Sequence, residues 1–411
     1  MNICLFCYRG NPYCGGQGGY LYFLSRELAL MGHSLTILVG SPEPWPMPWA
    51  EVIQVENLNL WGVRKNFLPS SSPWRIFRPL NFWELASTRL GFFPEMLLFS
   101  IRALSLLKKI TPRRNFAVLH DVQSLGYGLL LMRRFRLPLV TTVHHPLTID
   151  FQASIERDRT FEEKYYTVVF YPLRMQRRVI RHCDRVITSS KETAREIHRA
   201  FGVSPHKIRM VYNGLDAGFF RPIEEEPKKP QTLLFVGNTD DAKKGIDHLL
   251  KAMTLLPESV FLTIVDGGAP LKTYAPRRVR DLGLSSRVTF TGKVSAETLR
   301  RFYNTSEVVV LPSLYEGFGL PAAEAMACAT PVVATLAGAL PEVVGNGEGG
   351  ILVPPRDPQA LAAAILKILR DETLKKNMGV LGRKRVERLF TWPKVAERTI
   401  EVYKELIGER A

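Results

Sequence analysis

Three absences limit what this chain can be. Five cysteines among 411 residues form an odd and sparse set, which argues against a disulfide scaffold and favours a reducing compartment. The N-terminus has neither the basic start nor the apolar core of a signal peptide. The longest stretch without a charged side chain, residues 325–341, is 17 residues long and contains Pro331 and Gly338. It is too short and too interrupted to span a bilayer, so we expect a cytoplasmic protein.

Two of the cysteines have the spacing of a metal or redox site. Cys4 and Cys7 form a C-x-x-C pattern, but no second pair follows at the distance that zinc sites use. Both lie in the apolar segment NICLFCY, which predicts a first strand. A structural role in that strand is the favoured interpretation, and zinc or redox chemistry is the alternative.

Positive charge exceeds negative charge, and the excess lies in one half of the chain. Lys and Arg number 55 against 39 Asp and Glu, a net charge of +16. Residues 1–222 hold 29 basic and 16 acidic side chains (+13), whereas residues 223–411 hold 26 and 23 (+3). This asymmetry favours an anionic partner for the first half: nucleic acid, a membrane surface or a phosphorylated ligand. The alternative is a basic surface that is simply solvated.

The hydrophobic pattern alternates between strands and helices in two series. The chain opens with a strand, the loop NPYCGGQGG, a helical stretch and the strand SLTILVG, a βαβ unit that implies a parallel sheet. A polar, proline-marked segment at 216–230 separates the two series. We expect an α/β protein with two Rossmann-like domains facing each other across a cleft. Further strands are expected at 117–121, 139–145, 185–190 and 208–214, and then at 232–238, 261–267, 288–292, 307–313, 331–335 and 350–354.

Residues 60–115 differ from the rest of the chain. They combine Trp, Phe and Arg with few acidic residues. On amphipathic helices this composition is typical of a membrane interface. The alternatives are a lid over an acceptor site and ordinary helix packing against the sheet.

The segment EGFGLPAAE, which starts at Glu316, has the features of an anion-binding helix start. Gly317 and Gly319 let backbone N–H groups approach a ligand closely, and Pro321 favours the first turn of a helix. Glu316 precedes this helix and Glu324 lies one turn into it, so two carboxylates could accept hydrogen bonds from hydroxyls on both sides of a diphosphate. Alternatively, Glu324 complements the helix dipole and Glu316 is a solvated loop residue.

This segment, with the EAMACATPVVAT that overlaps and continues it, resembles the E-x7-E signature of retaining glycosyltransferases of family 4, which have the GT-B fold. The motifs GGQGGYLYFLSRELALMGH, TTVHH, DRVITSS, YNGLD, KKGID, VTFTG and TWPKV resemble other family segments in the same order. The resemblance covers nearly the whole chain except residues 60–115. It implies an acceptor-side domain at 1–218, a nucleotide-sugar-binding domain at 219–390 and a C-terminal helix at 391–411 that crosses back to the first domain.

The resemblance also implies roles for residues of the E-x7-E segment. Glu316 would hold hydroxyls of the donor sugar, and Glu324 would hold the ribose. Backbone N–H groups around Phe318, Gly319 and Leu320 would face the sugar or its phosphate.

Three further positions match family motifs. Lys244 matches the lysine that contacts the diphosphate, where a fixed cation stabilises the leaving nucleotide. Gly15 and Gly16 match the glycine pair near the donor phosphate and the acceptor. His144 matches the histidine that touches the donor sugar, and the neighbouring His145 is the alternative for that role.

One position departs from the family pattern. Family members usually have arginine after the glycine of FVG, where this chain has Asn238, which can donate hydrogen bonds but brings no charge. Lys243 or an arginine of the first domain would compensate, or donor binding is altered. No D-x-D motif occurs, so the resemblance implies a metal-independent reaction without a cofactor.

The function implied is retaining transfer of a sugar from a UDP- or GDP-sugar to a lipid or glycan acceptor in cell-envelope or polysaccharide synthesis. Same-face attack, with the acceptor proton passing to the departing phosphate, is favoured over double displacement because both glutamates match hydroxyl-binding positions. A sugar-nucleotide epimerase or phosphorylase of the same fold is the alternative. The basic half then points to the acceptor or to an anionic membrane that carries it, with the protein peripheral at the inner membrane face.

Two other classes are disfavoured. A nucleic-acid-binding protein would be expected to show a zinc finger, an aromatic RNA-binding motif or a basic helix array, and none occurs. For a Rossmann dehydrogenase, the loop GGQGG lacks G-x-G-x-x-G spacing and no acidic residue ends the strand SLTILVG.

Overall fold

The computed structural model describes residues 1–11, 16–60, 73–266, 274–345 and 347–409. The chain forms two compact units. Unit 1 comprises Met1–Ser189, Thr193–Val211 and Val395–Ala411, and unit 2 comprises Ser190–Glu192 and Tyr212–Lys394. The end of the chain therefore packs with its beginning. The domain boundaries and the cleft expected from the sequence stay predictions.

Unit 1 is built on a parallel sheet. Among its described residues, seven strands pair in the order β3-β2-β1-β4-β5-β6-β7. The central strands are rich in Val, Ile and Leu and are buried on both faces, as parallel strands covered by helices must be. The strands are β1 Asn2–Cys7, β2 Ser34–Gly40, β3 Glu51–Val55, β4 Val118–Val122, β5 Leu139–Val143, β6 Arg185–Thr188 and β7 Ile208–Met210.

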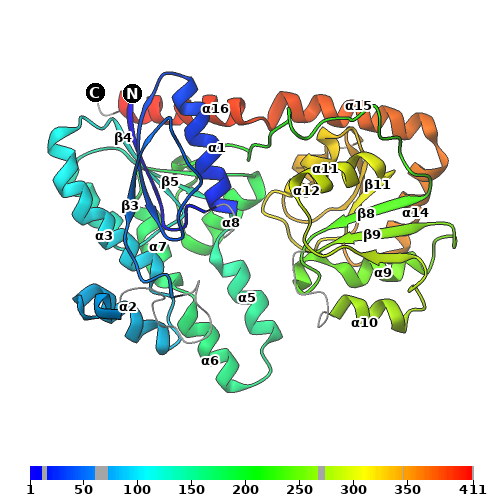
Figure 1. Cartoon of the computed structure of the whole chain (residues 1–411), viewed down its shortest axis with the longest axis horizontal. Helices are drawn as coiled ribbons and strands as arrows, with labels where there is room; N and C mark the ends of the chain where they lie inside the picture. The colour runs from blue at the N-terminus through cyan, green and yellow to red at the C-terminus, as the bar shows by residue number, and fades with distance from the viewer. Residues whose placement is uncertain (12–15, 61–72, 267–273, 346, 410–411) are drawn as a thin grey trace. The chain divides into compact units, whose positions relative to one another are not determined.

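Helices connect and cover these strands. Figure 1 shows the C-terminal helix α16, in red, running back beside the blue N-terminal elements, and its residues from Val395 onward belong to unit 1. The helices are α1 Gly16–Leu30, α2 Pro79–Arg89, α3 Glu95–Ile110, α4 Gly128–Met132, α5 Leu147–Arg157, α6 Phe161–Phe170, α7 Leu173–His182, α8 Lys191–Phe201 and α16 Trp392–Gly408.

Unit 2 repeats this plan with a second parallel sheet. Among its described residues, six strands pair in the order β10-β9-β8-β11-β12-β13. The strands are β8 Thr232–Val236, β9 Phe261–Val265, β10 Val288–Phe290, β11 Val308–Leu311, β12 Val332–Thr335 and β13 Gly350–Val353. The helices are α9 Ile246–Met253, α10 Tyr274–Asp281, α11 Ala296–Thr305, α12 Leu320–Ala327, α13 Leu340–Val344, α14 Pro358–Arg370 and α15 Glu372–Leu389.

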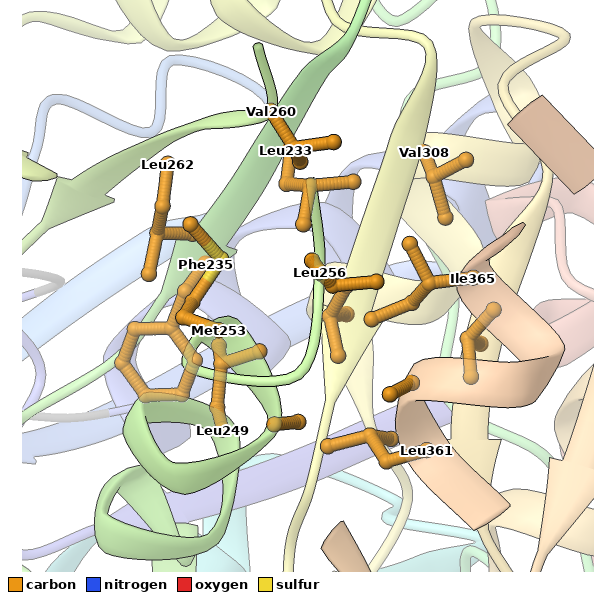
Figure 2. Packing of buried hydrophobic residues seen from close by; sticks show 14 of the residues in the cluster. Leu233, Phe235, Leu249, Met253, Leu256, Val260, Leu262, Val308, Leu361 and Ile365 are labelled. Carbon is orange, nitrogen blue, oxygen red and sulfur yellow. The ribbon is translucent and has the colours of Figure 1, made fainter. Parts of the chain in front are cut away.

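The core of unit 2 lies on both faces of its sheet. Alternate residues of a strand point to opposite faces, so Leu233 and Phe235 join one buried cluster while Leu234 joins another. Figure 2 shows the first cluster, in which Leu249 and Met253 of α9 and residues of α14 pack against the strands. Each fully buried Leu or Phe stabilises the fold by about 1.5–3 kcal/mol.

The structure confirms the two parallel sheets and adds one strand that the pattern did not reveal. The edge strand β3, EVIQV, is only partly buried and is paired with β2. Its pattern is short and mixed, and it follows a proline-rich stretch, so it lacks the apolar run by which the other strands were recognised. Cys4 and Cys7 lie in β1 as expected, with fully buried free thiols, and burial raises the pKa of Cys7 to about 12.

The aromatic and basic stretch divides into two parts, apart from residues 61–72, which lie outside the described residues. Helix α3 packs into the core through residues such as Phe99 and Leu107, so for α3 the alternative of ordinary packing is correct. The 3₁₀ turn Pro73–Phe77 and α2 instead expose Trp74, Phe77 and Trp83. Within the described part of the chain, no helix combines the length and apolarity needed to cross a membrane.

Candidate functional site

In unit 2 the predicted donor-binding residues gather where the strand order reverses. Strands β8 and β11 are neighbours in the sheet although the elements α9, β9, α10, β10 and α11 lie between them in sequence. In open α/β sheets, ligands bind at the carboxyl ends of the strands at such a switch point. The loop after β8 leads to Lys244, and the loop after β11 leads to Glu316.

Close backbone packing fixes the loop that contains Lys244. Gly245 has φ +65°, and a Cβ there would lie 2.0 Å from the carbonyl oxygen of Pro312, so no other residue fits without movement. The Leu314 amide donates to the Lys243 carbonyl (2.6 Å). These contacts hold the backbones of the two loops together, so Lys244 lies beside the residues that follow β11.

Glu316 and Lys244 form an ion pair in this loop cluster. Lys244 Nζ lies 2.7 Å from Glu316 Oε1, and the Ser313 hydroxyl donates to the same oxygen (3.0 Å). The Glu316 side chain is about 10% exposed and that of Lys244 24%. Gly338, at φ +55°, lies against the Glu316 backbone, where a Cβ would be 2.2 Å from the carbonyl oxygen. A cation and a carboxylate thus reach the same small region from two loops.

Helix α12 begins directly after this cluster. Gly319 is its N-cap, with φ +96° and no side-chain cap hydrogen bond, and Pro321 lies in the first turn. Phe318 is buried and its ring packs against Phe390 at a centroid distance of 5.4 Å, while Leu320 is 37% exposed. The helix start therefore has the form that the sequence predicted for an anion-binding turn.

Glu324 is held by a residue that the sequence analysis missed. The Tyr303 hydroxyl on α11 donates to Glu324 Oε2 (2.7 Å). Burial raises the pKa of the Glu324 carboxyl and, more strongly, that of the Tyr303 phenol. Because the two residues lie 21 positions apart on different helices, no local pattern could have paired them.

The position that departs from the family pattern has a local structural role. Asn238 is exposed, and its Oδ1 accepts a hydrogen bond from the Asp240 amide (2.9 Å). Lys243 Nζ lies 3.8 Å from Asp241 Oδ2. The structure places both residues on the loop that ends at Lys244, and whether Lys243 replaces the missing arginine stays a prediction.

In unit 1 the strand order reverses between β1 and β4, and the predicted residues follow β1 and β5, which is the neighbour of β4. Gly16 is the exposed first residue of α1, and a Cβ there would meet open space; Gly15 lies outside the described residues. His144 directly follows β5, and its ring meets the Tyr20 ring edge-on at 4.6 Å. His145 instead directs Nε2 to Asp150 Oδ2 (2.8 Å) on α5.

Gln123 is a second residue that the sequence analysis missed. Its side-chain Oε1 accepts from the His144 amide (2.8 Å), and its Nε2 donates to the His145 carbonyl (3.0 Å). Gln123 itself has φ +52°, which is uncommon outside glycine. A polar residue just after the buried strand β4 was the available signal, since function collects at the carboxyl ends of parallel strands.

Within the described ranges, no group of three or more His, Cys, Asp and Glu side chains could hold a metal ion. The chemistry of the unit 2 cluster is that of a fixed cation beside a carboxylate, with backbone N–H groups at a helix start. Such a set can bind a phosphate and the hydroxyls of a sugar.

Comparisons with known proteins identify the family of this chain. The family described as "Glycosyltransferase Family 4" matches residues 14–219, and "Glycosyl transferases group 1" matches residues 216–385. The chain is 36% identical to "MMP alpha-(1->4)-mannosyltransferase" of Mycolicibacterium hassiacum, over all of both chains. It is 31% identical to "D-inositol 3-phosphate glycosyltransferase" of Xylanimonas cellulosilytica, over 98% of this chain and 94% of that one.

Solved structures show the same fold. Sucrose-phosphate synthase from Thermosynechococcus elongatus is 26% identical, with a TM-score of 0.73 and all of both chains covered. The fold is therefore the α/β fold called GT-B, with two Rossmann-like domains. The chain belongs to glycosyltransferase family 4, and the protein is a glycosyltransferase.

Proposed function

We propose that the protein is a retaining, metal-independent hexosyltransferase that moves a sugar, with mannose as the first candidate, from a UDP- or GDP-sugar to a hydroxyl of a glycan or lipid acceptor. The observation that carries the proposal is the Lys244–Glu316 pair, 2.7 Å apart at the switch point of the unit 2 sheet. Mannose is chosen because a mannosyltransferase is among the relatives that match over the whole chain, at 36% identity.

The proposed reaction assigns each residue a separate task. Lys244 stabilises the negative charge that grows on the departing phosphate, as a preorganised cation does without reorganisation. Glu316 accepts hydrogen bonds from donor-sugar hydroxyls, and Glu324 holds the ribose. The acceptor hydroxyl attacks the anomeric carbon from the face that the phosphate leaves, and its proton passes to that phosphate. Neither glutamate forms a covalent intermediate.

His144 is proposed to touch the donor sugar, in preference to His145. The support is that His145 is engaged by Asp150, whereas the backbone of His144 is held by Gln123 at the carboxyl end of the sheet.

A donor panel tests the proposal directly. Thermal unfolding is measured with GDP-mannose, UDP-glucose and ADP-glucose, because a ligand that binds the native state raises the melting temperature by mass action. The donor that shifts it is then incubated with manno-oligosaccharides, and NMR of the new linkage reports the anomeric configuration. An inverted configuration, or turnover that requires added Mg²⁺, would contradict the proposal.

The same assay separates the alternatives of epimerase and phosphorylase. An epimerase changes the sugar nucleotide without any acceptor, and a phosphorylase needs inorganic phosphate to release the sugar from a glycan. Product formation that depends only on donor and acceptor excludes both.

We also propose that unit 1 binds to an anionic membrane surface. The membrane-facing surface consists of Trp74, Phe77, Trp83, Leu90 and Phe92. Trp74 and Phe77 are 78% and 75% exposed, and their rings stack at 6.1 Å.

Basic residues accompany this surface, and their charge is the reason for choosing anionic lipid as its partner. Arg75, Arg78 and Arg89 lie among the aromatic side chains, and the first two are bridged by Glu56. Aromatic rings at the lipid interface and arginines at the headgroups are the expected arrangement.

Vesicle sedimentation tests this part. The protein should sediment with phosphatidylglycerol vesicles at low salt and be released at high salt, because the Debye length shortens. The double variant W74S/F77S should lose binding, whereas Val380→Ser, at a half-exposed apolar position on α15, should not. Binding unaffected by W74S/F77S, or concentration-dependent dimerisation abolished by it, would overturn the membrane assignment.

A further inference from the structure

A chain of buried polar side chains in unit 1 links the C-terminal helix to strand β5. The Tyr403 hydroxyl lies 2.5 Å from His120 Nδ1, and His120 Nε2 lies 2.7 Å from Thr142 Oγ1. The Tyr20 hydroxyl on α1 lies 3.5 Å from the same Thr142 oxygen. All four side chains are buried. The partners come from α16, β4, β5 and α1, so the network joins two helices to two neighbouring strands of the sheet.

A second contact joins the same helices. The Thr399 hydroxyl, which donates to the Val395 carbonyl (2.7 Å), lies beside the Tyr20 hydroxyl. Thr399 and Tyr403 are four residues apart on α16, so they lie on one face of that helix. Because α16 presents two hydroxyls to this network, its register on the sheet is coupled to the position of Tyr20.

The members of the network are uncharged, so each hydrogen bond in it has a defined donor and a defined acceptor. Burial lowers the pKa of His120 to about 3, so its imidazole is neutral and has one donor nitrogen and one acceptor nitrogen. The Tyr403 and Thr142 hydroxyls must then take opposite roles toward it. A buried polar network that is fully paired rigidifies its surroundings, and loss of one member leaves a buried group without its partner.

The network ends at His144. The Tyr20 ring meets the His144 ring edge-on, with centroids 4.6 Å apart. The backbone of His144 is held separately, by Gln123. Ring and backbone are thus fixed by different residues, and only the ring depends on Tyr20.

We propose that Tyr403 and Tyr20 are positioning residues for His144, with the C-terminal helix acting on its ring through His120 and Thr142. The inference rests on the proposed contact of His144 with the donor sugar. The Tyr403 hydroxyl fixes which nitrogen of His120 donates, His120 fixes the Thr142 hydroxyl, and Thr142 and Thr399 fix the Tyr20 ring against which His144 lies.

Tyr403→Phe tests the far end of the network, since it removes one oxygen and keeps the ring. We expect kcat to fall by about tenfold, the usual scale for one lost hydrogen bond, while the KM for the donor changes little. Tyr20→Phe should give the same loss from the near end. The matched control is Ile400→Val, which removes one buried methylene from the same helix and should leave kcat unchanged.

A spectroscopic readout separates positioning from general destabilisation. Long-range ¹⁵N–¹H NMR of the histidine side chains reports the tautomer of His120 and the environment of His144. Tyr403→Phe should shift the ring signals of both histidines in the folded protein, and Ile400→Val should shift neither.

A double-mutant cycle with His144→Ala distinguishes a failure of the proposed role of His144 from a failure of the positioning role of Tyr403. If His144→Ala leaves transfer unchanged, the proposed role of His144 is wrong. If His144→Ala impairs transfer, Tyr403→Phe should add nothing to it, because coupled residues are not additive. A full additional loss, or unchanged His144 ring signals in Tyr403→Phe, overturns the positioning role while leaving the proposed function intact.

Discussion

The two units hold their candidate residues by opposite kinds of interaction. In unit 2 the cluster is charged. Lys244 and Glu316 pair across two loops whose backbones are in close contact at Gly245. In unit 1, His144 is held by neutral groups, the Gln123 amide and the Tyr20 ring. Yet residues 1–222 have a net charge of +13 and residues 223–411 only +3. The net charge of a region therefore does not report the charge at its site.

The position of the basic residues explains this difference. On α7, Arg174, Arg177, Arg178 and Arg181 are all exposed, while the buried side of the helix is formed by residues such as Val179. The arginines therefore create a field at the surface of unit 1 and leave its buried network neutral. A surface field of this kind would act on the large anionic partner that we propose, whereas the local pairs would act on the substrate.

The largest effect is expected from the carboxylate of unit 2. Glu316→Gln keeps the shape of the side chain but removes the charge that pairs with Lys244, and it should lower kcat/KM by about 10³-fold, the upper scale for one preorganised contact. Steady-state kinetics measure it. Glu348→Gln, which removes an exposed carboxylate from its pair with Arg385, is the control and should remain active. A fully active Glu316→Gln would show that the charged cluster is not the site.

A smaller loss, about 10²-fold, is expected for Lys244→Ala, because the fixed cation would be missing when charge develops on the phosphate. The matched control Lys251→Ala removes a lysine that pairs with Asp247 on α9. Equal effects of the two variants on transfer would indicate that any lysine of unit 2 contributes in the same way. The contrast between a charged site in unit 2 and a neutral one in unit 1 would then be wrong.

Gly245→Ala tests whether backbone packing creates the charged cluster. The added Cβ would collide with the Pro312 carbonyl oxygen, and φ +65° strains any residue with a side chain. We expect a loss of about 1–3 kcal/mol in the free energy of unfolding, measured by urea denaturation, together with reduced transfer. Gly283→Ala has a similar φ of +67° but open space around it, so it should lose less stability and no activity.

The smallest effect concerns the ion pairs that hold α16 on unit 1. Arg209 and Arg185 hydrogen-bond to Glu405 and lower its pKa from 4.5 to about 2. A carboxyl with a depressed native pKa stabilises the fold fully above its unfolded pKa, and that contribution is lost as the pH falls from about 4.5 toward 2.

Glu405→Gln should therefore narrow the difference in melting temperature between pH 6 and pH 3 relative to the unaltered protein. Glu401→Gln, on the same helix and paired with Arg398 at the surface, provides the comparison. An equal narrowing in both variants would mean that these pairs do not anchor the helix.

Much of the secondary structure followed from the sequence. The alternation of apolar strands and amphipathic helices is local, and each expected strand overlaps one in the structure, with several ending two to four residues earlier. The expected strand 208–214, for example, ends at Met210. Strand ends were overestimated because the residues that follow a strand at its carboxyl end are apolar or small and continue the pattern. The edge strand β3 was missed because half of it faces away from the core.

The candidate site could be predicted only in part. Glu316 and Lys244 were identified by motif, but Ser313, Tyr303 and Gln123 were not. Each of the missed residues acts on a partner placed by the fold, as Tyr303 does on Glu324. Residue type alone does not distinguish a tyrosine of this kind from an ordinary core residue, because its function depends on what its hydroxyl meets.

The sequence by itself determined the two α/β series, the glutamate-bearing helix start and the uneven charge, since all three are properties of neighbouring residues. Only the tertiary structure decided which groups meet. Lys244 and Glu316 are 72 residues apart, and His120 and Tyr403 are 283 apart. They come together because the strand order reverses beside β8, and because α16 returns to unit 1, and both events depend on the packing of whole elements.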